Sequence, residues 1–129
     1  SFHPRHMEYA HVDGDAAACR LLDCAPAIHL TLDAYHSAIA GVDTAALMRR
    51  YAGRVDIIHL KDAVECKKGA TLTPVGAGAI DFMPVISACR DAGVKAIMAE
   101  QESWQDDAFE CMKQSLSYLR GALKTLHYT

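Results

Sequence analysis

Three predicted strands of this sequence end in side chains that can ligate a metal ion. In chain order these are Asp33 at the end of residues 27–33, His59 near the end of residues 54–60 and Glu100 at the end of residues 95–100. Carboxylate and imidazole ligands suit a borderline-hard divalent cation such as Mn²⁺, Mg²⁺, Co²⁺ or Zn²⁺. Such a cation polarises a carbonyl group and stabilises an enediolate, and a carboxylate beside it moves the proton.

Each of these three residues also has a purely structural interpretation. Asp33 could cap the turn that follows its strand, because aspartate often accepts hydrogen bonds from nearby backbone N–H groups. His59 follows two isoleucines and could be a hydrogen-bonded core histidine. A purely structural role fits Glu100 least well, since burying an unpaired carboxylate is costly.

Further polar residues lie next to the predicted ligands. His36 either contacts the site or lies on the surface, and Lys61 either faces the substrate or pairs with Asp62. Glu102 and His6 are expected to be solvated. The glycines of residues 74–78 are expected to let a loop close over the site, because a single G-x-G without a preceding strand is no dinucleotide fingerprint.

The elements that must position these side chains alternate between strand and helix. The predicted helices cover residues 43–53, 81–92 and 106–126, and an earlier unit has a strand end in residues 2–9 and a helix at 15–23. This order predicts an α/β fold with a parallel sheet, whose strand carboxyl ends share one edge. About four βα units fit either a small doubly wound domain or half of a TIM barrel, which typically needs ~250 residues.

Composition excludes several classes of protein. Hydrophobic residues make up 51% of the 129 residues, which is enough for one domain with a core. The net charge of −3 and the lack of a basic cluster argue against nucleic-acid binding, and no apolar run approaches the length of a membrane span. The five cysteines are odd in number and lack C-x-x-C spacing, so we expect a reduced, cytoplasmic protein.

Six segments in order resemble the sugar phosphate isomerase/epimerase family of xylose-isomerase-like TIM barrels. They are residues 30–36 (LTLDAYH), 40–43 (AGVD), 53–55 (GRV) with 59–62 (HLKD), 75–82 (VGAGAIDF), 99–102 (AEQE) and 115–119 (SLSYL). The resemblance covers nearly the whole chain. It implies the C-terminal half of a (β/α)8 barrel with one divalent metal ion at the carboxyl ends of its strands.

The resemblance also implies a set of ligands. Asp33, His59 and Glu100 match the family's ligands on the sixth, seventh and eighth strands. Residues 3–9 (HPRHMEY) resemble a His-Asn-His-x-x-Glu-Phe pattern on the fifth strand, which puts His3 at the fourth-ligand position. Arg5 replaces the second histidine of that pattern and is assigned to substrate binding.

The function implied is a divalent-metal-dependent isomerase or epimerase of a sugar or polyol, with Mn²⁺ as the first choice of metal. Glu100 would coordinate the cation and move the proton, while His36 and Lys61 would contact substrate oxygens. A lyase such as a keto-inositol dehydratase is the alternative, because His3 leaves Glu100 as the one obvious carboxylate base. A three-metal endonuclease would need more ligands and a basic face.

On this resemblance, residues 1–129 form a partial barrel domain whose N-terminal half, strands one to four, is absent from the chain. Half a barrel leaves unpaired sheet edges and an uncovered apolar interior. Pairing with a second copy, giving a homo-oligomer, is therefore a further expectation. An inactive fragment or binding module that keeps the ligands without a competent pocket also stays open.

Overall fold

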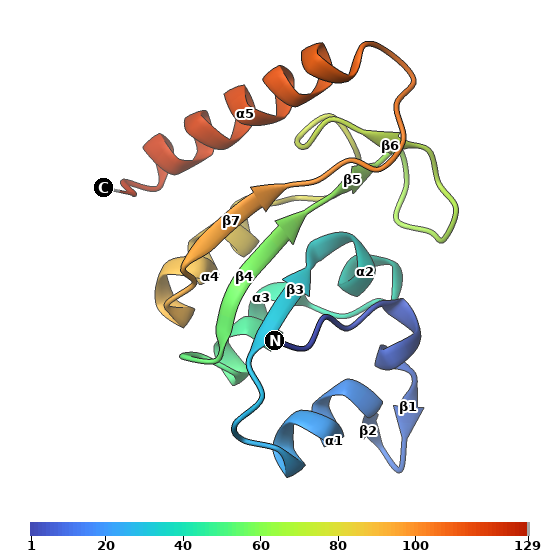
Figure 1. Ribbon diagram of the computed structural model, residues 1–129, viewed down its shortest axis with the longest axis vertical. Helices are drawn as coiled ribbons and strands as arrows, with labels where there is room; N and C mark the ends of the chain where they lie inside the picture. Colours follow the sequence, from blue (N-terminus) through green and yellow to red (C-terminus); the bar gives the residue numbers. More distant parts are fainter. Residues whose placement is uncertain (129) are drawn as a thin grey trace.

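Three parallel strands form the sheet that carries the predicted ligands (Figure 1). In the computed structural model, which describes residues 1–128, the order across this sheet is β3 (Leu30–Asp33), β4 (Val55–Leu60) and β7 (Ala96–Ala99). β4 is central, and its β-branched residues Val55, Ile57 and Ile58 suit a strand with neighbours on both sides. The predicted parallel α/β fold is therefore confirmed.

The register of the sheet brings the strand ends level with one another. Asp33 lies directly opposite His59, and His59 lies opposite Met98, two residues before Glu100. At the other edge, Phe2 forms a parallel bridge with Leu30, so the first residues of the chain extend the sheet beyond β3. Their hydrogen bonds run from Phe2 N–H to the His29 carbonyl (2.7 Å) and from Thr31 N–H to the Phe2 carbonyl (2.9 Å).

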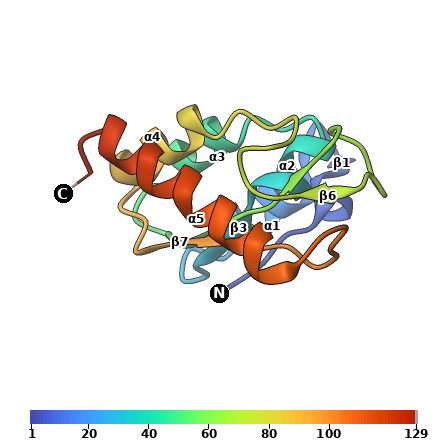
Figure 2. The same ribbon diagram turned by 90° about the horizontal axis from the view of Figure 1, so that it is seen from above.

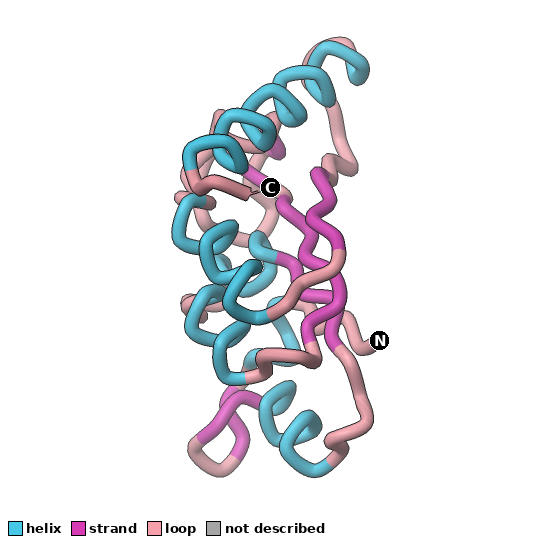
Figure 3. Tube along the Cα trace, turned by 90° about the vertical axis from the view of Figure 1, so that its left-hand side faces the viewer, coloured by secondary structure: helices cyan, strands magenta, loops and turns pink. Residues whose placement is uncertain are grey.

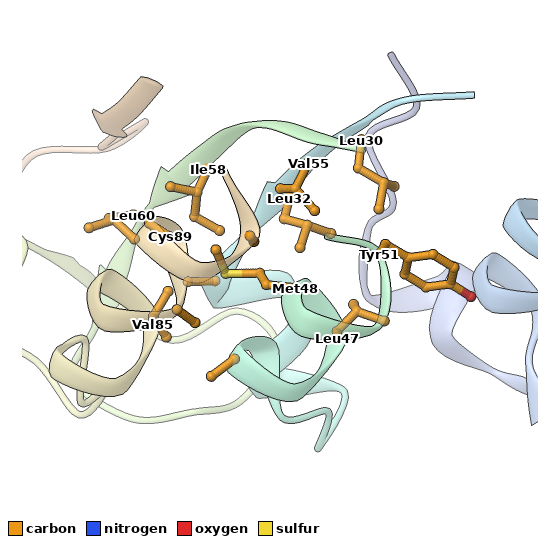
Figure 4. Packing of buried hydrophobic residues seen from close by; sticks show 14 of the residues in the cluster. Leu30, Leu32, Leu47, Met48, Tyr51, Val55, Ile58, Leu60, Val85 and Cys89 are labelled. Atoms are coloured by element: carbon orange, nitrogen blue, oxygen red, sulfur yellow. The ribbon is translucent and has the colours of Figure 1, made fainter. Parts of the chain in front are cut away.

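The helices cover one face of the sheet. Figure 2 and Figure 3 show α3 (Thr44–Arg50) and α4 (Met83–Ala92) on one side and the N-terminus on the other. The strand side chains that point toward the helices are fully buried: Leu30, Leu32, Val55, Ile58 and Leu60. Met48 of α3 and Cys89 of α4 pack into this layer (Figure 4). Each such side chain contributes about 1.5–3 kcal/mol by leaving water.

The predicted helices begin and end close to the expected residues. Asp43 caps α3 by accepting a hydrogen bond from Ala46 N–H (3.0 Å), and α4 has its proline in the first turn. Gly93 ends α4 with a φ of 73°, a conformation that glycine adopts without strain. Asp107 caps α5 (Ala108–Thr125), which runs beside β7.

Several boundaries differ from the prediction. The strand predicted at 27–33 begins only at Leu30, and the helix predicted at 81–92 begins at Met83. The helix predicted at 15–23 is α1 (Ala17–Cys24). The expected strand end in residues 2–9 is wrong beyond Phe2, because His6–Tyr9 form a short 3-10 helix, η1.

Five short elements were not predicted. They are α2 (Ala34–Ile39), the hairpin of β1 (His11–Val12) with β2 (Asp15–Ala16), and the hairpin of β5 (Asp62–Ala63) with β6 (Leu72–Thr73). Two-residue strands carry too little alternation for a pattern to detect. No helix within residues 1–128 combines the length and the apolar character needed to cross a membrane.

Candidate metal centre

The carboxyl end of the sheet gathers three of the predicted ligands. One ligand atom each from His3, Asp33 and His59 lies within 4.8 Å of the other two. His3 reaches this place because the Phe2 bridge carries the first residues of the chain alongside β3. Its Nε2 lies 3.9 Å from Asp33 Oδ2.

Asp33 is both a helix cap and a candidate ligand. Its Oδ1 accepts hydrogen bonds from the backbone N–H groups of Tyr35 (2.8 Å) and His36 (3.1 Å) at the start of α2. Its Oδ2 is buried and has no hydrogen-bond partner in the described part of the chain. The two interpretations of the sequence are therefore compatible, since the cap uses Oδ1 and leaves Oδ2, which lies 3.3 Å from Lys61 Nζ, available to a cation.

Glu100 follows β7 and adjoins this cluster through His59. Its Oε2 lies 2.6 Å from His59 Nδ1, but Glu100 is outside the group of three residues whose ligand atoms lie within 4.8 Å of one another. Buried polar atoms normally have partners, and an orphaned one calls for an ion or water. Asp33 Oδ2 contacts Lys61, and His59 Nδ1 and Glu100 Oε2 contact each other, but none of these three buried atoms makes a well-formed hydrogen bond within residues 1–128. Their donor types fit a divalent cation with oxygen and nitrogen ligands.

Lys61 is the cation that faces these carboxylates. Its Nζ lies 3.3 Å from Asp33 Oδ2, 3.4 Å from Glu100 Oε1 and 3.1 Å from Glu102 Oε1, and its side chain is 2% exposed. Burial lowers the pKa of Lys61, but the three carboxylates outweigh burial and raise it above its usual value. Lys61 therefore stays charged, and three carboxylates against one ammonium leave a net charge that a divalent cation would neutralise.

Glu102 is a site residue that the sequence analysis placed in solvent. Its side chain is 65% exposed, as expected, but it also reaches Lys61. The hydrogen bond from Lys61 is the main reason why the pKa of Glu102 lies below its usual value. The sequence signal that could have identified Glu102 is its position two residues after the predicted ligand Glu100.

The remaining predicted site residues lie at increasing distances from the cluster. The His36 ring is 6.2 Å from that of His3 and stacks on His6, with ring centroids 5.6 Å apart. Burial lowers the pKa of His36, so its imidazole is neutral near pH 7. Arg5 is exposed just before η1, and no ion pair joins its guanidinium to an acidic residue within residues 1–128, so its substrate role stays a prediction.

Asp62 points away from Lys61 and organises the neighbouring loop. Its buried carboxylate accepts hydrogen bonds from the backbone N–H groups of Ala63 (2.9 Å), Gly76 (3.0 Å), Gly78 (2.9 Å) and Ile80 (3.3 Å). A Cβ on Gly78 would collide with Asp62 itself. These glycines allow the loop to pack tightly against Asp62, and their expected role in letting the loop close over the site stays a prediction.

Comparisons with known proteins agree with this fold. No family model matches the chain. An inosose dehydratase of Lacticaseibacillus casei is 26% identical over 110 residues, covering 71% of this chain and 37% of that protein. A sugar phosphate isomerase/epimerase structure from Parabacteroides distasonis superimposes with a TM-score of 0.78 at 20% identity, covering 93% of this chain and 44% of that one.

Other solved structures share the same architecture. The structure of L-ribulose 3-epimerase gives a TM-score of 0.67 at 19% identity, covering 87% of this chain and 42% of that one. The chain thus spans less than half the length of the proteins it matches. Xylose isomerase domain proteins are also among its structural neighbours. The chain therefore has the α/β fold of roughly half of a xylose-isomerase-like TIM barrel, the fold of the sugar phosphate isomerases/epimerases that it resembles.

Proposed function

We infer that this chain carries the metal centre of a divalent-metal-dependent isomerase or epimerase of a sugar or polyol. The observation that supports this function is the cluster of His3, Asp33 and His59, whose ligand atoms lie within 4.8 Å of one another, with Glu100 Oε2 2.6 Å from His59 Nδ1. Mn²⁺ is the cation we expect, and Mg²⁺, Co²⁺ and Zn²⁺ suit the same donor set. The sugar phosphate isomerase/epimerase and L-ribulose 3-epimerase structures share the fold that presents these residues.

Different residues of the chain would have different roles in such a reaction. A divalent cation held by His3, Asp33, His59 and Glu100 would polarise the carbonyl oxygen of the substrate. The Glu100 carboxylate would accept the proton from the carbon next to that carbonyl and return it. The neutral imidazole of His36 would exchange a hydrogen bond with a substrate hydroxyl, because one ring nitrogen donates and the other accepts.

A lyase is the second candidate, and His3 is the residue that favours it. Proton transfer on two faces of a substrate is simplest with two carboxylates, whereas His3 supplies an imidazole where a second carboxylate could stand. Glu102 is engaged elsewhere, since it pairs with the Lys61 ammonium that also contacts Glu100. The sequence relative in Lacticaseibacillus casei is an inosose dehydratase.

Solvent isotope exchange distinguishes the two reactions. The full-length protein is incubated with Mn²⁺ in D₂O with free ketoses and, separately, with a keto-inositol, and the products are followed by NMR and mass spectrometry. Isomerisation or epimerisation predicts deuterium at the carbon next to the carbonyl without loss of water. Loss of water would identify the lyase, and no exchange with any of these substrates would contradict both functions.

A further inference from the structure

Lys61 contacts two of the predicted ligand carboxylates. Its Nζ lies 3.3 Å from Asp33 Oδ2, the buried oxygen that makes no hydrogen bond, and 3.4 Å from the carboxylate of Glu100. Asp33 is fully buried, so without Lys61 this carboxylate would be an uncompensated charge. The ammonium thus holds the ligand carboxylates in place in the metal-free chain.

An ammonium and a divalent cation on the same carboxylate oxygen repel each other strongly. Two such charges a few ångströms apart at a shielded site interact by several kcal/mol even at an effective dielectric constant of about 20. The ammonium must therefore move away from Asp33 Oδ2 when that oxygen binds a metal ion. The lysine side chain is flexible enough to do so, provided that it finds another anion.

Glu102 is that other anion. Its Oε1 already lies 3.1 Å from Lys61 Nζ, closer than either of the predicted ligands. Glu102 is 65% exposed and lies in the loop that follows β7, so its carboxylate can follow the ammonium outward. Neither Lys61 nor Glu102 belongs to the predicted set of ligands.

We propose that Lys61 is an internal placeholder cation, which holds Asp33 and Glu100 in the metal-free protein and moves onto Glu102 when a divalent cation binds. This inference rests on the metal centre of the proposed function. It gives Lys61 and Glu102 opposite effects on metal affinity that require no substrate.

The test measures the Kd for Mn²⁺ by calorimetry and the melting temperature of the metal-free protein. Lys61→Met removes the competing charge, so we expect Mn²⁺ to bind at least about tenfold more tightly and the metal-free protein to melt earlier. Saturating Mn²⁺ should recover more of the lost melting temperature than it adds to the wild type. Lys61→Gln, which keeps a polar end without the charge, should act in the same direction and replaces Lys61→Met if that variant does not fold.

A matched control comes from another lysine in a short ion pair. Lys95 lies 2.7 Å from Asp56 at the opposite end of the sheet, and its side chain is mostly exposed. Lys95→Met removes the same charge and should leave the Kd for Mn²⁺ within about twofold, since exposed charges more than a Debye length of about 8–10 Å apart are largely screened. Any general effect of net charge would appear in this control.

Glu102 supplies the decisive comparison. Glu102→Gln should weaken Mn²⁺ binding about three- to tenfold, because the ammonium then has no other anion to pair with. In the Lys61→Met background the same change should alter the Kd by less than about twofold, because the two residues act as a pair.

The possible outcomes separate the failure of this inference from the failure of the metal centre. If Lys61→Met leaves Mn²⁺ affinity unchanged or weakens it, the placeholder role is wrong. An equal effect of Glu102→Gln in both backgrounds would also overturn it, because Glu102 would then act directly on the metal ion by its charge. A wild-type protein that binds no Mn²⁺ would instead refute the metal centre, and this inference with it.

Discussion

Asp33 uses its two carboxylate oxygens for different purposes. One oxygen caps α2 through two backbone N–H groups, and the other is buried without a hydrogen-bond partner among the described residues. The cap restricts the rotation of the carboxylate, so Oδ2, which contacts the Lys61 ammonium, points in a fixed direction. Such preorganisation lowers the entropy that a metal ion would otherwise have to remove on binding.

Asp62 provides a residue-scale prediction about stability. Asp62→Asn replaces one acceptor oxygen by an NH₂ group that would face backbone N–H donors of the 76–80 loop. We expect the free energy of unfolding to fall by about 2–3 kcal/mol, since buried donors lose their acceptor. The measurement is urea denaturation of both proteins.

Asp81→Asn is the control for this prediction. Asp81 also accepts a backbone hydrogen bond, from Met83 N–H (3.0 Å), but it is exposed. Its substitution should cost less than about 1 kcal/mol, because water can replace the lost bond. Equal losses for Asp62→Asn and Asp81→Asn would show that the buried carboxylate does not hold the loop.

Part of the candidate site could be predicted from the sequence, because its residues lie at the ends of parallel strands. Asp33, His59 and Glu100 were found because each follows a clear apolar strand, and parallel strands end at a common edge. The role of Glu102 depends on the path of the loop after β7, which no local pattern encodes. The alternative of a Lys61–Asp62 pair could have been set aside from the sequence, since neighbouring residues on extended backbone point to opposite faces.

At the scale of the element, β4 connects the site to the opposite end of the sheet. His59 lies near its carboxyl end, and Asp56 lies at its start, where it contacts His29 (2.9 Å) before β3 and Lys95 (2.7 Å) before β7. These ion pairs join the three strands at the end away from the candidate metal centre.

Asp56, through these contacts at the strand starts, makes the free energy of unfolding depend on pH. The hydrogen bond from Lys95 is the main reason why the pKa of Asp56 lies below its usual 3.8. A depressed carboxyl pKa stabilises the folded state above the usual pKa, and this contribution is lost as the pH falls through the lower, folded value. The wild type should therefore be more stable than Asp56→Asn at about pH 5.5, and the difference should shrink as the pH falls below the usual carboxyl pKa of 3.8.

Thermal unfolding of both proteins across this pH range measures the difference. Asp106→Asn removes an exposed carboxylate that forms no ion pair within residues 1–128, and it serves as the control. A gap between wild type and Asp56→Asn that stays constant down to pH 3 would rule out the carboxylate as its source.

The long elements were predictable and the short ones were not. α3, α4 and α5 have caps and apolar faces that match their observed positions within a few residues. α2 has only six residues and begins directly at the end of β3, where Asp33 caps its first turn. A helix this short has little stability of its own, so tertiary contacts determine whether it forms.

At the scale of the whole molecule, the sheet is open. β7 pairs with β4 on one side, and its other edge has no strand partner among the described residues. Met98 of β7 and Phe109 of α5 are large apolar side chains that are exposed in this chain. An open apolar edge favours association with further strands, so a homo-oligomer stays a prediction.

Anomalous diffraction from crystals of the protein grown with Mn²⁺ tests the metal centre most directly. The account predicts one anomalous peak at the carboxyl end of the sheet, within about 2.0–2.6 Å of oxygen or nitrogen atoms of Asp33, His59 and Glu100, with His3 as the fourth ligand. Lys61 Nζ should lie closer to Glu102 than to Asp33 in that structure. A fully occupied peak elsewhere, or no peak at this edge at saturating Mn²⁺, would contradict the account.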